Sequence, residues 1–326
     1  MRRVLTAVLA GSLLFAACSS DSSDSTDAAS TEAGATEAAT EAIATEAAAT
    51  EAPATDVMAS EAAGTKAGDP PAIGSGAAAS CAKGKTVNAD KLVIATGEPA
   101  FPPYVIDDKP DSGEGFEAAV GQAVARELGF DVTKTSWIRT PFDAAIAPGP
   151  KDFDFNLQQF TITDERKQAV DFSEGYYTAA QAVFGLADSS AANAKSVADL
   201  KGLKIGVAVG TTSLTYVEET IKPTSAPLVY NDNAAAKAAL ESKQIDAIVS
   251  DLPTALYITG VEIQGSKVYG QIAGTGTDQF GLLLSKGSKL TECVNLAITA
   301  LKSSGELDTI TTKWMSEFTS APVIAA

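Results

Sequence analysis

From residue 81 onward, hydrophobic and polar positions follow two alternating patterns. Short continuous apolar runs, such as residues 91–96 (KLVIAT), predict buried strands. Residues 116–128 instead place an apolar side chain at every fourth position, which predicts a helix that Gly129 ends. The same patterns predict further strands at residues 131–137, 153–157, 180–186, 204–208, 228–230, 247–250 and 279–284, and further helices after Ser196 and at residues 142–146, 212–221, 234–242, 290–304 and 307–318.

This order of elements predicts α/β architecture, with mainly parallel sheets flanked by helices. Two stretches, residues 176–180 and 275–279, are placed to cross between two lobes. If the chain crosses and returns, the last helices belong with the first lobe. We therefore expect lobe 1 to contain residues 81–178 and 278–318, lobe 2 to contain residues 179–277, and a tail to follow at residues 319–326.

The first 17 residues have the pattern of an export signal. Two arginines precede an apolar run from Val4 to Ala17, which is shorter than the roughly 20 residues of a membrane span. The segment LFAACSS resembles a bacterial lipobox, in which the cysteine, here Cys18, is lipidated and becomes the mature N-terminus. The alternative is an ordinary secretory signal with an incidental cysteine. In both cases we expect an exported protein, and with lipidation one anchored on the extracytoplasmic face of the membrane.

Residues 19–80 are of low complexity and rich in threonine, glutamate and alanine. Large apolar side chains are almost absent, so this segment cannot bury a core, and we expect a disordered tether. As a flexible coil it would reach on the order of 40–45 Å.

The composition excludes several classes of function. The formal net charge is −17, which argues against nucleic-acid binding and weakens any attraction to anionic lipid. The chain contains no histidine and three cysteines, so we expect no metal site and no cofactor. With Cys18 assigned to the lipid, Cys81 and Cys293 remain as an even pair. In an exported protein they predict a disulfide that closes a loop of roughly two hundred residues, and two unpaired thiols are the alternative.

Five segments together resemble one family. KLVIATGEPAFPPYV, EGFEAAVGQAVARELG, QQFTITDERKQAVDFSEGYY, LKGLKIGVAVGTTS and IDAIVSDLPTA are similar, in order and spacing, to the polar amino-acid-binding proteins of bacterial ABC importers, the family 3 solute-binding proteins. The resemblance covers about residues 87–318. It implies a type II periplasmic-binding-protein fold, in which two lobes joined by a two-strand hinge hold a free amino acid in the cleft between them.

A free amino acid carries a carboxylate and an ammonium, so its site needs a fixed cation and a fixed anion. The resemblance places the carboxylate on Arg166, whose planar fork binds carboxylates in a bidentate manner, and the ammonium on Asp251. It assigns further donors to Thr161 and to the backbone of Gln159. In the alternative interpretations, Arg166 pairs with a nearby acid on a solvated helix, and Asp251 is an ordinary helix N-cap.

The remaining site residues are also implied by the resemblance. Gly210, Thr211 and Thr212 lie between a predicted strand and helix, where their amides can meet an anion. Phe101 and Phe142 match the two walls that enclose the ligand side chain, with core aromatics as the alternative.

Specificity residues are expected next to these positions. Glu98 matches an acid that reaches the ligand side chain, which favours a polar or basic amino acid. Gln158 and Gln159 replace the small residues that the family usually has before its T-I-T motif.

We therefore expect a monomeric receptor, not an enzyme, that captures a free amino acid and delivers it to an ABC permease in the membrane. Two alternatives use the same fold. One is an enzyme like the dehydratases of cyclohexadienyl acids, which would need a general acid over the ligand. The other is a ligand sensor.

Overall fold

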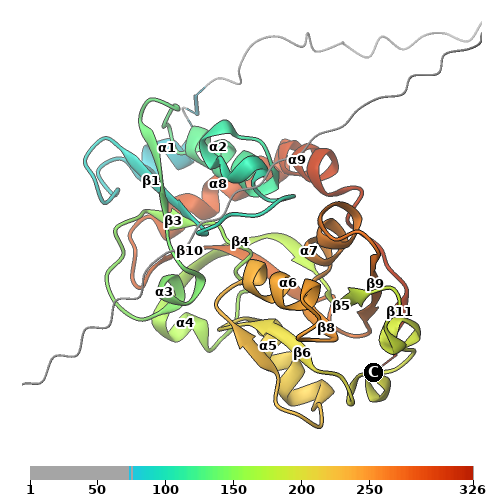
Figure 1. Ribbon diagram of the computed structural model, residues 1–326. Helices are drawn as coiled ribbons and strands as arrows, with labels where there is room; N and C mark the ends of the chain where they lie inside the picture. Colours follow the sequence, from blue (N-terminus) through green and yellow to red (C-terminus); the bar gives the residue numbers. More distant parts are fainter. Residues whose placement is uncertain (1–72, 75, 326) are drawn as a thin grey trace, which may run out of the picture. The chain divides into compact units, whose positions relative to one another are not determined.

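The computed structural model describes residues 73–74 and 76–325. It contains two β-sheets, each flanked by helices (Figure 1). The expected signal peptide, Cys18 and most of the expected tether lie outside the described residues.

The first sheet has five strands in the order β2-β1-β3-β10-β4. Their bounds are Leu92–Thr96 (β1), Thr135–Arg139 (β2), Phe155–Asn156 (β3), Val170–Ala179 (β4) and Asp278–Ser285 (β10). The helices that belong to this sheet are Ala77–Ala82 (α1), Phe116–Glu127 (α2), Phe142–Ile146 (α3), Arg166–Ala169 (α4), Thr291–Ser303 (α8) and Glu306–Met315 (α9), with short 3-10 turns at Ile106–Asp108 and Pro110–Ser112.

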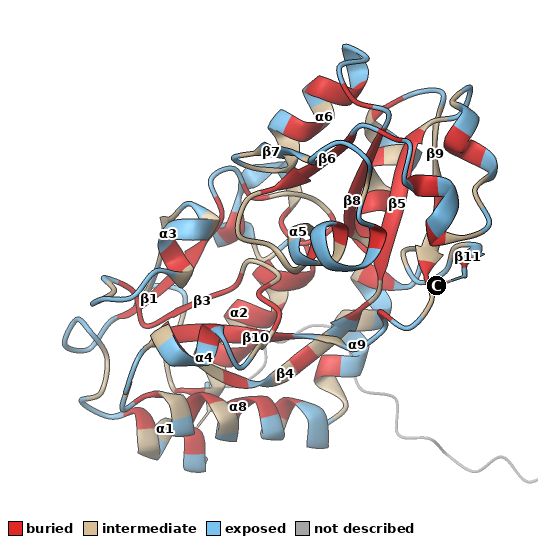
Figure 2. Ribbon diagram, turned by 90° about the horizontal axis from the view of Figure 1, so that it is seen from below, coloured by how far each residue is buried: buried red, intermediate tan, exposed pale blue. Residues whose placement is uncertain are grey.

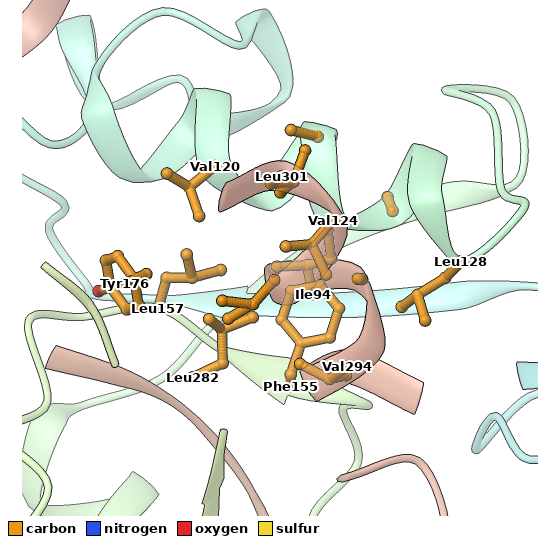
Figure 3. Packing of buried hydrophobic residues seen from close by; sticks show 14 of the residues in the cluster. Ile94, Val120, Val124, Leu128, Phe155, Leu157, Tyr176, Leu282, Val294 and Leu301 are labelled. Carbon is orange, nitrogen blue, oxygen red and sulfur yellow. The ribbon is translucent and has the colours of Figure 1, made fainter. Parts of the chain in front are cut away.

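The main core lies between this sheet and helices α2 and α8. Figure 3 shows Ile94, Phe155 and Leu282 from the strands among apolar side chains of both helices. Helices α2 and α8 contribute Val120, Val124, Val294 and Leu301 to this core, and Leu128 joins them from the C-cap of α2. Because β10 and α8 belong here, the chain returns to the first sheet after crossing the second.

The second sheet has six strands in the order β11-β9-β5-β8-β6-β7. Their bounds are Gln181–Leu186 (β5), Ile205–Ala208 (β6), Leu228–Tyr230 (β7), Ala247–Asp251 (β8), Ser266–Ile272 (β9) and Val323–Ile324 (β11). The helices around it are Thr212–Tyr216 (α5), Asn233–Glu241 (α6) and Leu252–Tyr257 (α7), with shorter helical turns at Ser190–Asn193, Val197–Leu200, Val217–Ile221 and Ile258–Glu262. Figure 2 shows that β5, β6 and β8 are buried, whereas α6 has one exposed face.

Both sheets are mixed, with more antiparallel pairing than the sequence suggested. Strand β10 runs antiparallel to β3 and β4, and β5 runs antiparallel to β8 and β9. The reason is the crossing itself: β4 leads into the second sheet through β5, and β10 returns beside β4 in the opposite direction. Antiparallel neighbours of this kind need no crossover helix.

Two boundaries differ from the expected ones. Helix α1 begins at Ala77, so regular structure starts before residue 81. The last residues are not a free tail: Val323 and Ile324 pair with β9, and Ile324 is 1% exposed. The isoleucine side chain fills part of the second core, which explains why this end of the chain is held.

Cys81 in α1 and Cys293 in α8 form a disulfide, with the two Cα atoms 5.4 Å apart. Both helices pack on the first sheet, so the bond lies within one part of the fold. Among the described helices, none has the length and apolar character needed to span a membrane.

Candidate functional site

A cleft of about 440 Å³ lies where strands of both sheets end. The loops that follow β1 and β3 line it from the first sheet, and those that follow β6 and β8 line it from the second. Ligands of open α/β sheets bind at these carboxyl ends of strands. Ten of the predicted site residues line the cleft: Glu98, Phe101, Phe142, Gln158, Gln159, Thr161, Arg166, Thr211, Thr212 and Asp251.

Arg166 begins the short helix α4, and its side chain is 9% exposed. One guanidinium nitrogen, Nη1, donates to the carbonyl of Thr161 at 2.7 Å, and Nη2 donates to the carbonyl of Gly210 at 2.9 Å. Its Cζ lies 5.4 Å from the centre of the Phe142 ring. Of the five N–H donors of a guanidinium, these bonds use two, which leaves three for a ligand.

No ion pair between described residues includes Arg166. Burial lowers its pKa, while the carboxylates of Asp251 and Asp278 act in the opposite direction. An arginine remains protonated under all ordinary conditions, so the cleft wall carries a buried positive charge. The alternative of a pair on a solvated helix does not fit this burial.

Asp251 ends β8 and occupies the N-cap position of α7, but its side chain makes no capping hydrogen bond. Its Oδ1 instead accepts from Nε2 of Gln181 at 2.8 Å. Burial and the neighbouring Asp278 raise the pKa of Asp251 to about 7. The carboxylate is therefore directed away from the helix it precedes, and it titrates near neutral pH.

A polar network that the sequence did not reveal connects these groups at the crossing strands. Oδ2 of Asp278 accepts from Nε2 of Gln181 at 3.0 Å and from the hydroxyl of Thr212 at 3.1 Å. The hydroxyl of Ser213 donates to Oε1 of Gln181 at 2.6 Å. Polar side chains at the first positions of the apolar strands β5 and β10 were the available signal, but their pairing depends on the crossing geometry.

Of the side chains expected to contribute near Arg166, those of Thr161, Thr211 and Thr212 line the cleft. The hydroxyls of Thr161 and Thr212 are 3.4 Å apart, so the two sheets approach each other here. The side chain of Thr211 caps α5 by accepting from the amide of Leu214. Gly210 is not part of the cleft lining and contributes its carbonyl to Arg166 instead.

The backbone of Gln159 is engaged differently from the prediction. Its N–H donates to Oε1 of Glu117 at 2.8 Å, and its side-chain Nε2 donates to Oε2 of the same carboxylate. Glu117 is buried and also accepts from the hydroxyl of Tyr176. A buried carboxylate needs such donors, so this amide is not available to a ligand carboxylate.

Aromatic and acidic side chains line the rest of the cleft. Phe142 stacks on Phe160 with ring centres 4.8 Å apart, which orients its ring beneath Arg166. Phe101 lies in the loop after β1. Besides Glu98 and Asp251, two more acids line the cleft, Asp143 and Asp232. No group of three or more potential metal-ligating side chains occurs within residues 73–74 and 76–325.

The family model of the bacterial extracellular solute-binding proteins, family 3, matches residues 92–317. The chain belongs to this family. As a solute-binding protein of an extracellular family, it is an exported protein.

Its relatives bind amino acids, as their names state. The L-arginine-binding protein of Pseudomonas aeruginosa is 32% identical over 240 residues, which are 71% of this chain and 90% of that protein. The glutamine-binding protein GlnH of an ABC transporter of Bacillus subtilis is 33% identical over 219 residues, 64% of this chain and 76% of that protein.

Solved structures agree with the fold of this family 3 protein. An ancestral arginine-binding protein bound to arginine matches with a TM-score of 0.60 and 31% identity, covering 69% of this chain and 98% of that one. The ancestral amino-acid-binding protein AncCDT-1, a precursor of cyclohexadienyl dehydratase, matches with a TM-score of 0.58 and 30% identity over 69% of this chain and 95% of that one. The curated relatives are binding proteins rather than enzymes.

Proposed function

We propose that this protein binds a free α-amino acid in the cleft and delivers it to an ABC permease in the membrane. Arg166 binds the α-carboxylate and Asp251 binds the α-ammonium. The observation that carries the proposal is that a buried guanidinium and a desolvated carboxylate line one cleft, and neither belongs to an ion pair between described residues. A zwitterion supplies the partner that each of them lacks.

The ligand side chain then lies between Phe101 and Phe142. After Arg166 and Asp251 are used, the charged groups left in the lining are Glu98, Asp143 and Asp232, all acidic. This excess of negative charge favours a basic side chain over an acidic one. The arginine-binding relatives support the same preference.

Outside the described residues, we infer that Cys18 carries a lipid anchor and that residues 19–72 belong to the tether that joins it to the folded part. We infer that the protein acts as a monomer and needs no cofactor.

A thermal-shift screen over the twenty amino acids tests the receptor function. Each charge-assisted hydrogen bond contributes about 1.5–3 kcal/mol, so three or four of them suffice for micromolar affinity after the costs of binding. We expect basic amino acids to raise the melting temperature most and acidic ones to have no effect. If no amino acid raises the melting temperature, the protein is not an amino-acid receptor.

A dehydratase is the second candidate, because Asp251 titrates near pH 7 inside the cleft and one solved relative is a dehydratase precursor. Elimination requires a general acid at the ligand. We favour binding because a protonated Asp251 would leave the ligand ammonium without its counter-charge. Incubation with a cyclohexadienyl acid distinguishes the two, since an enzyme consumes the acid and a receptor leaves it unchanged.

A further inference from the structure

The carboxylate of Glu117 lies beside the cleft but is not part of its lining. Glu117 stands in the first turn of α2, where the helix dipole favours a negative charge, and it is 1% exposed. No ion pair between described residues includes it. Neutral donors alone satisfy it, and two of the three belong to Gln159.

Gln159 occupies an unusual backbone conformation. Its φ is 52°, in the left-handed region that costs a residue with a side chain about 1–2 kcal/mol. Such a conformation persists where the surroundings over-determine it. Here both the N–H and the side-chain amide of Gln159 are held by the same carboxylate.

The backbone turn at Gln159, the Gln159 corner, directly precedes the residues that bind the ligand in the proposed function. Two positions later, the carbonyl of Thr161 accepts from Nη1 of Arg166. Strand β10 holds the far side of the segment, because the N–H of Ile162 donates to Gln279 and that of Gly281 donates to Phe160. The near side has Glu117 as its anchor, so Glu117 acts on Arg166 through Gln159 and Thr161.

We propose that Glu117 is a positioning residue for amino-acid binding, which fixes the Gln159 corner and thereby the orientation of Thr161 and Arg166. The inference rests on the proposed function of the cleft. It also assigns a role to the glutamine that replaces a small residue of the family at position 159: its side chain is the second contact of this anchor rather than a contact to the ligand. Burial raises the pKa of Glu117 to about 7, as expected for a carboxylate held without a cation.

The test reverses the direction of one hydrogen bond. In Glu117→Gln, the side-chain oxygen still accepts from the Gln159 N–H and from Tyr176, but its new NH₂ faces the NH₂ of Gln159. Adding Gln159→Glu restores a donor and an acceptor with their positions exchanged. L-arginine is the probe, titrated by calorimetry, and Glu114→Gln, an exposed acid just before the same helix, is the control.

We expect Glu117→Gln to weaken arginine binding at least tenfold, the double variant to recover to within threefold of the original, and the control to bind normally. A purely structural role would lower the melting temperature without changing the affinity of the folded fraction. Unchanged affinity of folded Glu117→Gln, or a double variant as weak as the single one, would overturn the proposal. If Glu117→Gln does not fold, Gln159→Met removes the same hydrogen bond, and unchanged affinity of that variant overturns it equally.

Hydrogen–deuterium exchange of the ligand-free protein separates this inference from the proposed function. We expect faster exchange in the segment of residues 157–162 in Glu117→Gln and recovery in the double variant. If the original protein binds no amino acid, the proposed function fails, while the exchange result still decides whether Glu117 holds the corner; equal exchange in all variants would show that it does not.

Discussion

Asp251 has a raised pKa and is the proposed partner of the ligand ammonium, so its role can be measured in solution. Its pKa is raised to about 7 in the ligand-free protein, by burial first and by Asp278 second. An ammonium placed beside it favours the charged carboxylate and lowers that pKa. Below about pH 7, amino-acid binding therefore expels a proton, and affinity falls as the pH is lowered from 8 to 6.

Calorimetry at pH 6.5 in two buffers of different ionisation enthalpy measures this proton release directly. We expect the apparent binding enthalpy to differ between the buffers at pH 6.5, and the difference to be smaller at pH 7.5, where less of Asp251 is protonated. Asp251→Asn is expected to lose binding because the ammonium loses its counter-charge. A binding enthalpy that is independent of the buffer at pH 6.5 would contradict the role of Asp251.

The same raised pKa values affect stability. The folded-state pKa of Glu117 and of Asp251 is about 7, above their ordinary values of 4.5 and 3.8. At any pH between the ordinary value and 7, the folded state therefore binds more protons than the unfolded state. Stability therefore decreases as the pH rises through this range. Between pH 5.5 and 8 we expect the free energy of unfolding of the ligand-free protein to fall by on the order of 2 kcal/mol per group.

Urea unfolding at both pH values checks this trend. The variant with Glu117→Gln and Asp251→Asn should lose most of the difference between them. Equal or greater stability at pH 8 would mean that these carboxyl groups are not desolvated as described.

At the residue scale, the positions next to recognisable motifs could be predicted, and the partners from other elements could not. The family resemblance placed Arg166 and Asp251 in the site, and both residues line the cleft. Gln181, Asp278 and Glu117 became visible only in three dimensions. Each is polar in an otherwise ordinary strand or helix, and its partner lies tens of positions away.

At the element scale, the disulfide links two helices that pack on the first sheet, and it does not line the cleft. Replacing both cysteines with serine should lower the free energy of unfolding by up to about 4–5 kcal/mol, since the closed loop is long. The affinity for the amino acid should stay the same. Thiol counting on the unreduced mature protein should find no free cysteine, and two free thiols would show that the bond does not form.

Continuous apolar strands were predictable, whereas strands that depend on their neighbours were not. The runs at β1, β6 and β8 are mostly apolar, and every residue in them is buried apart from Asp251 at the end of β8. Strand β9 was missed because only part of it is buried, so its sequence, SKVYGQI, has no apolar run. Strand β4 reads VDFSEGYYTA, and its long pairing with β10 makes it a strand.

At the scale of the whole molecule, the last residues make a third connection between the sheets. Helix α9 packs with the first core, and a few residues later β11 joins the second sheet beside β9. The N–H of Ala273 donates to Ile324, and that of Val197 donates to Ala325. The family model ends at residue 317, so this connection lies beyond the part of the chain that the family model matches.

Two neighbouring residues test whether β11 stabilises the fold. Ile324 is 1% exposed and Val323 is 62% exposed. Ile324→Ala should lower the free energy of unfolding by about 2–5 kcal/mol, the usual cost of truncating a buried isoleucine. Val323→Ala should change it by less than about 0.5 kcal/mol, as surface substitutions do. Equal effects, measured by urea unfolding, would mean that β11 is not docked in the second core.

The central claim is that Arg166 provides the positive charge for the α-carboxylate of a free amino acid. Calorimetric titration of the original protein and of Arg166→Ala with L-arginine tests it most directly. We predict one site of micromolar affinity in the original protein, and no detectable binding in a variant whose melting temperature is nearly unchanged. Binding by Arg166→Ala with the original affinity would contradict the claim.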